Sequence, residues 1–372
     1  MQLARWKTLK TTSSYYKCSA FRRDLEVTET FDVEQEELVV EGAQKFLQAH
    51  ITNLKSTQKS IRATKNNITY SCQWSISPIW TKEKPVVIIP IKDNLDLLSV
   101  TIKNLQNNNI DKHCNIIIVD DRSNEDIKKI VLKNSLSYLR VDNEKGFNFS
   151  MLNNIAAKIA HSLGASIAIL WNSDLWCVKE EWFEQLMQKH IQSKSVLSTT
   201  KLVYPPIALS LNKEEDNQNM RNHFPQMLGG KWRETVQFGG DAWGAVQGYL
   251  RLSPMHSGRF SSLTDPFVDC DRPCRFAPGA LHIWDLHKFI EIGGLNPTLA
   301  KNFQDVDICL RLVEAGIAPQ YFGKDIYFYH DESYTLTSKS AEPKYNNSFF
   351  SDQIIFGKIW NDKLAALVLG LS

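Results

Sequence analysis

The sequence lacks several features that would place it in a specialised class of protein. No apolar run approaches the ~20 residues that span a bilayer as a helix. The net charge of the 372 residues is only +2, which gives no electrostatic argument for a nucleic-acid partner. The seven cysteines are scattered, and the one close pair, Cys270 and Cys274, has no second pair to complete a four-ligand zinc site. These absences favour reduced thiols and a cytoplasmic protein, either free or peripheral to a membrane.

The N-terminal segment differs in composition from the rest of the chain. It is basic and rich in Ser and Thr, and it contains no acidic residue before Asp24. This composition fits an organelle transit peptide and equally a basic surface segment. Asp32 and Gln35 have the spacing of a capping box, which predicts a helix through about Leu54. Residues 1–82 carry no chemistry that we identify, so we expect an N-terminal extension that packs on the remainder or mediates association.

From residue 83 onward, strand-like and helix-like segments alternate. Short apolar runs predict buried strands, and the segments between them have helical periodicity. This alternation predicts an α/β fold with a mostly parallel sheet flanked by helices, in one domain over 83–362 followed by a tail at 363–372. The pattern fades between 205 and 275. Strands are predicted at 86–90, 115–119, 139–141, 167–171 and 326–329, helices at 95–105, 125–133, 151–162 and 305–314, and regular structure also at 279–284.

Polar side chains gather where these predicted strands end or helices begin. Asp174 follows an apolar strand, at the position where α/β sheets bind their ligands, and a carboxylate is a suitable oxygen ligand for a divalent cation. Asp305 opens a predicted helix and would serve either as its N-cap or as a functional carboxylate. Each cluster alone fits an ordinary turn or cap, but together and in order they favour one shared site. The clusters are Lys92-Asp93-Asn94, Asp120-Asp121, Asn172-Ser173-Asp174, Gln304-Asp305 and His330.

Six segments in order resemble the family 2 glycosyltransferases of GT-A fold. The branch they most resemble includes rhamnosyltransferase-like and O-antigen-type enzymes. The resemblance covers about residues 85–360 and leaves out 1–80 and much of 205–275. The segments are VVIIPIKDN (86–94), IIIVDDRS (116–123), NEKGFNFSMLNN (143–154), NSD (172–174), GALHIWDLHKFIEIGGLNPTLAKNFQDVDICLRL (279–312) and IYFYHDES (326–333).

The resemblance implies a hexosyltransferase-type enzyme with a GT-A-type, Rossmann-like sheet. Such an enzyme moves a sugar from a nucleotide-diphosphate donor to a glycan or other hydroxyl acceptor, as in polysaccharide biosynthesis. It implies Asp305 as the general base, and Asp174 and His330 as ligands of Mn²⁺ or Mg²⁺. One base without a placed nucleophile implies inversion at the anomeric carbon. The residues implied to bind the nucleotide sugar are Pro90, Lys92, Asp93, Asp121, Gly146, Asn148, Asn154 and Asn172.

Two residues depart from the family pattern. Gln304 stands where relatives carry Glu beside the base, and Lys92 stands where many carry Tyr, which leaves base stacking there open. Region 205–275 is expected to shape the acceptor side. Its aromatic residues would either stack on sugar rings or pack the region itself, and the sequence does not choose between these for Trp232, Trp243, His223 and His256.

Other functions fit the sequence less well. A nicotinamide-dependent oxidoreductase needs a glycine-rich turn after its first strand, and residues 90–93 contain no glycine. A sugar-nucleotide pyrophosphorylase would carry a glycine-rich, basic signature near the start of the sheet, which is not seen. A catalytically silent nucleotide-sugar or carbohydrate-binding protein of the same fold remains open, although the presence of both Asp174 and Asp305 argues against it.

Overall fold

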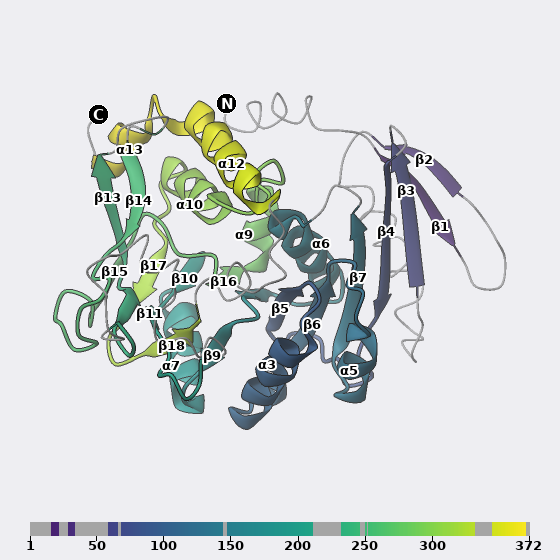
Figure 1. The fold of residues 1–372 in the computed structure, drawn as a ribbon, viewed down its shortest axis with the longest axis horizontal. Helices are drawn as coiled ribbons and strands as arrows, with labels where there is room; N and C mark the ends of the chain where they lie inside the picture. The colour runs from purple at the N-terminus through teal and green to yellow at the C-terminus, as the bar shows by residue number, and fades with distance from the viewer. Residues whose placement is uncertain are drawn as a thin grey trace.

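A sheet of twelve strands organises the molecule (Figure 1). The computed structural model describes residues 16–21, 29–33, 59–65, 68–143, 147–210, 232–245, 250, 252–331 and 344–369. The four central strands, in the order β7-β6-β5-β8, are parallel to one another. The predicted α/β fold with a parallel central sheet is therefore confirmed. These strands are β5 (Val86–Ile91), β6 (Asn115–Asp120), β7 (Ser137–Asn143) and β8 (Ile167–Trp171).

Apolar, β-branched sequence explains these strands. Every residue of β5 and β6 is buried, as expected for strands covered on both faces. The helices Leu95–Asn107, Ile127–Lys133 and Phe149–Ser162 fall where the periodicity predicts them, whereas Ile110–His113, Glu180–Gln192 and Leu286–Glu291 were not predicted. Helix α6 packs on β5, β6 and β8, α5 packs on β7, and α3 contacts β9. These helices are α3 (Leu95–Asn107), α4 (Ile110–His113), α5 (Ile127–Lys133), α6 (Phe149–Ser162), α7 (Glu180–Gln192) and α9 (Leu286–Glu291).

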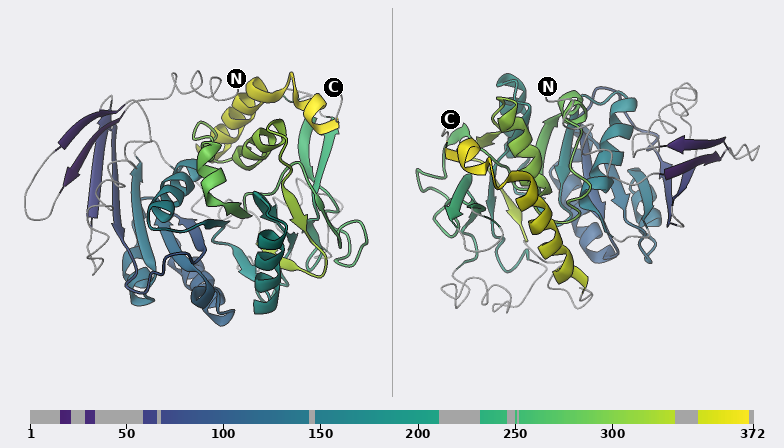
Figure 2. Two further views of the ribbon diagram at one scale, coloured as in Figure 1. Left: turned by 180° about the vertical axis from the view of Figure 1, so that it is seen from behind. Right: turned by 90° about the horizontal axis from the view of Figure 1, so that it is seen from above.

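Further strands extend the sheet on both sides of its parallel centre, all in antiparallel pairs except β10 and β17, which are parallel. At one end β4 pairs with β7, followed by β3, β1 and β2; at the other end β16 pairs with β8, followed by β10, β17 and β15 (Figures 1 and 2). Part of the N-terminal extension is thus built into the main sheet. The bounds are β1 (Tyr16–Phe21), β2 (Glu29–Val33), β3 (Lys59–Lys65), β4 (Ile68–Ser75), β10 (Leu197–Thr199), β15 (Asp271–Pro273), β16 (Leu281–Asp285) and β17 (Gln320–Phe322).

One N-terminal prediction is wrong. Asp32 was expected to cap a helix, but it lies inside β2, where it pairs with Lys17 of β1. Cross-strand pairing outweighs the local capping pattern at this position. The rest of the predicted helix lies outside the described residues.

A second, four-stranded sheet lies beside the first and has the order β12-β11-β18-β9. Region 205–275, which lacks periodicity in the sequence, contributes β12 to this sheet and also forms the β13–β14 hairpin. These strands are three to five residues long, too short for a periodic pattern to be visible in the sequence. Their bounds are β9 (Leu175–Cys177), β11 (Lys201–Val203), β12 (Val236–Phe238), β13 (Asp241–Ala245), β14 (Leu252–His256) and β18 (Tyr327–His330).

The C-terminal helices cover the end of the domain that carries α10 (Figure 1). Helix α10 (Gln304–Glu314) is joined to α12 (Lys344–Trp360) through the stacked rings of Phe303 and Phe356, 4.9 Å apart. The predicted tail contains α13 (Leu364–Leu369), which contacts α10. None of the helices in the described parts of the chain is long and apolar enough to cross a membrane.

Candidate active site

The strand order reverses at the centre of the sheet. The chain runs from β5 outward to β6 and β7, and then returns to the other side of β5 as β8. In open α/β sheets, ligands bind outside the carboxyl ends of the strands at the point where the strand order reverses. Here that point lies between β5, which ends at Ile91, and β8, which ends at Trp171.

The second sheet brings Asp174 and His330 together at this point. Asp174 lies in the turn between β8 and β9, and the register of β9 with β18 places His330 opposite Leu175. The Nε2 atom of His330 is 3.3 Å from Oδ1 of Asp174, and both side chains are buried. Two residues separated by 156 positions in the sequence, both predicted as metal ligands, thus meet across one strand pair.

The chemistry of this pair fits a divalent cation. Two ligands of one metal, with bonds of about 2.1 Å and an angle of about 90–110°, stand about 3.0–3.4 Å apart. The observed 3.3 Å separation falls in this range. A carboxylate oxygen suits Mn²⁺ or Mg²⁺, and imidazole nitrogen suits transition metals. Asn172, in the same turn, donates its backbone N–H to Ala280 and accepts at its carbonyl from Leu175.

Helix α3 holds the turn that carries Asp174. Thr101 donates its hydroxyl hydrogen to the backbone carbonyl of Ser173. Asn104 bonds both backbone polar groups of Cys177, each at 2.9 Å. Sequence analysis missed these two supporting residues. Their signal was present, since both are polar on a helix face that is otherwise apolar.

A buried carboxylate lies at the end of β6, beside the same crevice. Asp121 is 1% exposed, and no described group hydrogen-bonds its Oδ2 atom. Burial raises the pKa of Asp121 to about 6, although the Lys92 ammonium, 3.6 Å from Oδ2, opposes the shift. A buried carboxylate oxygen with unused acceptor capacity is suited to a ligand N–H or O–H group. Lys92 therefore accompanies Asp121 as an ion-pair partner.

The other residues predicted around β5 have structural contacts. Pro90 is buried within β5. Asp93 receives hydrogen bonds from the backbone N–H groups of Asn124 and Glu125, at 2.6 and 3.3 Å, and donates its own N–H to Ser123. These bonds join the loops after β5 and β6. Asp93 therefore holds these two loops together next to the point where the strand order reverses.

Asp305 lies at the first turn of α10, next to the turn that contacts Asn172. Its Oδ2 accepts the backbone N–H of Gly279 at 2.8 Å, and the neighbouring residue Ala280 bonds Asn172. The predicted base and the predicted metal motif therefore flank the same two-residue segment, Gly279–Ala280. Asp305 does not cap its helix, because Phe303, in the left-handed region with φ 62°, occupies the N-cap position.

The neighbours of Asp305 are distinct in their roles. Asp307 is engaged by Trp360 and Arg311, at 2.9 and 3.0 Å, and so faces away as expected. Gln304 is buried, and its Oε1 has no hydrogen-bond partner among the described residues. Burial lowers the pKa of His282. Its Nε2 contacts the backbone carbonyl of Ala277, and its Nδ1 accepts the indole N–H of Trp284.

Two of the predicted donor-binding residues bind the protein itself. Asn148 caps α6 by accepting from the N–H of Met151, and its amide donates to Pro297. Asn154 exchanges two hydrogen bonds with the backbone of Leu295, both at 2.8 Å. Their amides thus fix α6 to the loop 294–297. Gly146, and the loop histidine His223, lie outside the described residues.

Trp232, Trp243 and His256 of region 205–275 contact other protein groups. Trp232 is buried against Tyr204, with ring centroids 5.1 Å apart, and Trp243 lies edge-on to Phe276 at 5.6 Å. His256 meets the backbone carbonyl of Gln237 at 3.1 Å through Nδ1. These contacts favour the packing interpretation of the loop aromatics.

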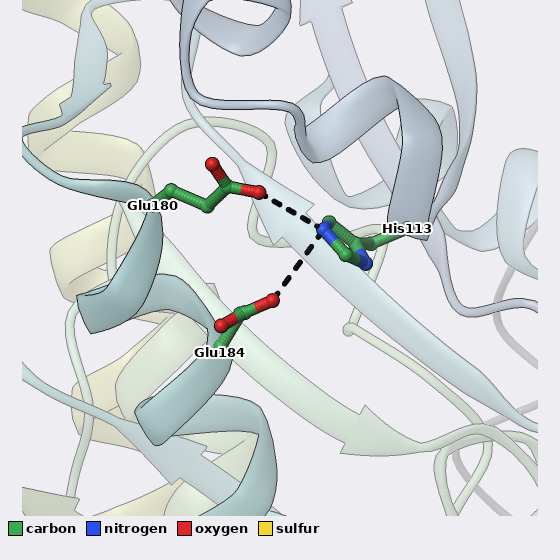
Figure 3. Close-up of side chains that lie close together, drawn as sticks. All are labelled: His113, Glu180 and Glu184. Carbon is green, nitrogen blue, oxygen red and sulfur yellow. Dashed lines mark hydrogen bonds and ion pairs between the residues drawn. The ribbon is translucent and has the colours of Figure 1, made fainter.

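A second group of possible metal ligands lies on the surface. The Nε2 atom of His113 is 3.2 Å from Glu180 and 3.5 Å from Glu184 (Figure 3). The three side chains are between a third and a half exposed. Glu180 lies in the first turn of α7, Glu184 lies one turn further along the same helix, and His113 is the last residue of α4. This cluster is therefore an exposed ion-pair group that joins two helix ends.

The part of the chain that contains the carboxyl ends of β5, β6 and β8 is similar to a known protein family. Residues 86–248 match the family model for glycosyl transferase family 2. Protein y4gI of Sinorhizobium fredii is 25% identical over 284 residues, which are 74% of this chain and 27% of that protein. The chain thus spans about a quarter of the length of that relative.

Two solved structures resemble this chain over part of its length. GalNAc-T7 with UDP, GalNAc and Mn²⁺ is 16% identical, with a TM-score of 0.47 over 67% of this chain and 44% of its own. The mannosyltransferase PcManGT from Pyrobaculum calidifontis, with GDP-Man and Mn²⁺, is 11% identical, with a TM-score of 0.40 over 90% and 83% of the two chains. Lys92, Asp121 and Asp174 all fall within residues 86–248, the segment that matches the glycosyl transferase family 2 model.

Proposed function

We propose that the protein is a metal-dependent, inverting glycosyltransferase. It would move a hexosyl group from a nucleotide-diphosphate sugar to a hydroxyl of a glycan or other acceptor, in the cytoplasm. The observation that carries this proposal is the buried Asp174–His330 pair at the carboxyl end of β8. Asp174 lies within the matched residues 86–248, and His330 lies outside them. Mn²⁺ is bound in structures of GalNAc-T7 and of the Pyrobaculum mannosyltransferase, and we carry a divalent cation over to this chain.

Each residue has a role that its surroundings support. Asp121 accepts a hydrogen bond from the base or ribose through Oδ2, which has no hydrogen bond within the described residues and forms an ion pair with Lys92. Asp174 and His330 hold the cation, with Asn172 in the same turn. A divalent cation supplies countercharge to the departing nucleotide diphosphate.

Asp305 is the proposed base for the acceptor. The acceptor oxygen attacks the anomeric carbon, the bond from that carbon to the diphosphate oxygen breaks, and the hydroxyl proton passes to Asp305. The Gly279 N–H fixes one carboxylate oxygen of Asp305 and so holds the side chain against the segment that contacts Asn172. A single displacement of this kind inverts the anomeric configuration.

The metal assignment is tested with Asp174→Ala. Donor hydrolysis is measured for a panel of nucleotide sugars, chosen by thermal shift in the presence of Mn²⁺. We expect the variant to fold, and to lose both turnover and metal-dependent donor binding. The matched control is Glu184→Gln, which removes a ligand from the exposed His113 cluster and should leave both properties unchanged.

The outcomes separate the alternatives. Activity that survives both EDTA and Asp174→Ala would contradict the metal assignment. Binding of a nucleotide sugar by the wild-type protein without hydrolysis or transfer, across the panel, would instead favour a silent binding protein. Loss of Mn²⁺ dependence in Glu184→Gln would move the functional metal to the surface cluster.

A further inference from the structure

Gln237 is a buried polar residue in an apolar strand. It lies in β12 between Val236 and Phe238, and all three residues are fully buried. Burying an amide costs free energy unless its polar atoms are hydrogen-bonded. Its Oε1 atom is 2.7 Å from Nδ1 of His330, and its Nε2 atom is 3.5 Å from the carbonyl oxygen of the same residue. The amide is thus directed at the one histidine of the proposed metal site.

An irregularity in the second sheet aims this side chain. Strand β11 pairs Leu202 with Phe238 and Val203 with Val236, so Gln237 has no partner residue on β11. Such a bulge inserts one extra residue and turns its side chain away from the regular alternation. The Gln237 amide reaches His330 in β18, on the far side of β11, because of this bulge.

The two contacts define which histidine nitrogen carries hydrogen. A backbone carbonyl can only accept, so the NH₂ group of the amide faces the His330 carbonyl and Oε1 faces the ring. An amide oxygen also only accepts, so Nδ1 of His330 is the donor. In the neutral ring the lone pair then lies on Nε2, which is the nitrogen 3.3 Å from Asp174.

We propose that Gln237 is a positioning residue that holds His330 with Nε2 directed at the divalent cation of the active site. This inference rests on the proposed function, because it assigns a supporting residue to that same metal site. Hydrogen-bond partners behind metal-binding histidines fix the ring and its tautomer, and their loss typically lowers metal affinity by about 10–100-fold. Gln237 touches neither the cation nor the substrates, so its effect passes through His330.

The test compares Mn²⁺ affinity in five proteins of the 372-residue chain, the wild type, Asp174→Ala and the three variants below, measured by electron paramagnetic resonance of free Mn²⁺. Gln237→Leu, which cannot accept from Nδ1, should raise the dissociation constant by about 10–100-fold. Gln237→Glu keeps an acceptor for the Nδ1 hydrogen and should stay within a few-fold of the wild type. The control Thr200→Val removes a different buried hydrogen bond, from Thr200 to Phe322, and should leave Mn²⁺ affinity unchanged.

A second measurement reads the ring itself. Long-range ¹⁵N–¹H spectra of histidine-labelled protein distinguish the tautomers, and His330→Gln assigns the signal. We expect the Nδ1–H form of His330 in the wild type and a mixture of tautomers in Gln237→Leu. A purely structural role for Gln237 would lower stability without moving this signal.

The results separate the two proposals. If Asp174→Ala binds Mn²⁺ as tightly as the wild type, the metal site of the proposed function is wrong. If Asp174→Ala weakens binding while Gln237→Leu leaves both the affinity and the tautomer unchanged, the site stands and the role of Gln237 is overturned.

Discussion

At the scale of single residues, the site contains two carboxylates whose surroundings differ in kind. Asp121 is buried without a hydrogen bond to Oδ2, whereas Asp305 receives two backbone N–H groups, from Gly279 and from Val306. A poorly partnered acceptor is available for a ligand that brings its own donor. A well-held carboxylate is fixed in place for a reaction, which is why we assign binding to the first and proton transfer to the second.

The role of Asp305 is tested by Asp305→Asn. Asparagine can still accept the Gly279 N–H but cannot take a proton, so stability and donor affinity should stay near normal. Turnover should fall by about 10²-fold or more, the range typical of general-base catalysis. The matched variant Asp307→Asn disturbs the contacts to Trp360 and Arg311 and should lower stability while folded protein keeps its turnover. Full transfer activity in Asp305→Asn would end the assignment of Asp305 as the base.

The raised pKa of Asp121 predicts a pH dependence of stability. Burial raises this pKa from 3.8 to about 6, so the folded state retains a proton that the unfolded chain loses. The contribution of Asp121 is then most favourable below pH 4 and declines as the pH rises through about 6. Asp121→Asn removes the ionisation and should stabilise the protein by about 1–3 kcal/mol at pH 7.5, with a smaller gain at pH 4.5.

Urea unfolding at these two pH values measures the effect. The control is Asp96→Asn, which alters an exposed carboxylate in the first turn of α3 and should show no such pH-dependent gain. An equal difference between Asp121→Asn and wild type at both pH values would show that burial of the charge carries no penalty.

At the scale of elements, the sequence predicts those helices and strands whose formation depends on interactions within one segment. The parallel strands β5, β6 and β8 and the helices α3, α6 and α10 were predictable, because buried apolar runs and helical periodicity are properties of a single segment. Strand β2 was not, since Asp32 satisfies a local capping pattern but is held in a strand by its partner in β1. Pairing between distant segments is invisible in such patterns.

The candidate site divides in the same way. Asp174 could be found from the sequence because it follows β8, an apolar run that is recognisable as a buried strand. The bulge at Gln237 could not, because it exists only relative to β11, whose three residues carry no periodic signal. The structural contacts of Asn148 and Asn154 with Pro297 and Leu295 could not be predicted either, because their partners lie about 140–150 residues away in the sequence.

At the scale of the whole molecule, both sheets contribute residues to the proposed site. The large sheet provides the strand ends with Lys92, Asp121 and Asn172, and the small sheet supplies His330 and Gln237. The turn that contains Asp174 connects a strand of one sheet, β8, to a strand of the other, β9. The proposed metal site therefore lies at the junction of the sheets, and its geometry depends on how they are held together.

The N-terminal strands lie at the opposite end of the large sheet from β15, and this order predicts the effect of truncation. Strand β4 covers the edge of β7 and buries Trp74, which is 2% exposed. Deletion of residues 1–66 removes β1–β3 but keeps β4 over the edge of β7, so the shortened protein should keep Trp74 buried and hydrolyse donor at the normal rate. Deletion of residues 1–82 exposes the edge of β7, and open sheet edges promote association between chains.

The longer deletion should therefore lower solubility while sparing donor hydrolysis by the folded fraction. Size-exclusion chromatography measures the soluble monomer, and hydrolysis is expressed per folded molecule. Since β7 contributes no residue to the proposed site, its exposed edge affects the yield of folded protein and not the chemistry. Complete loss of hydrolysis by a folded protein that begins at residue 83 would mean that the N-terminal strands supply groups the active site needs.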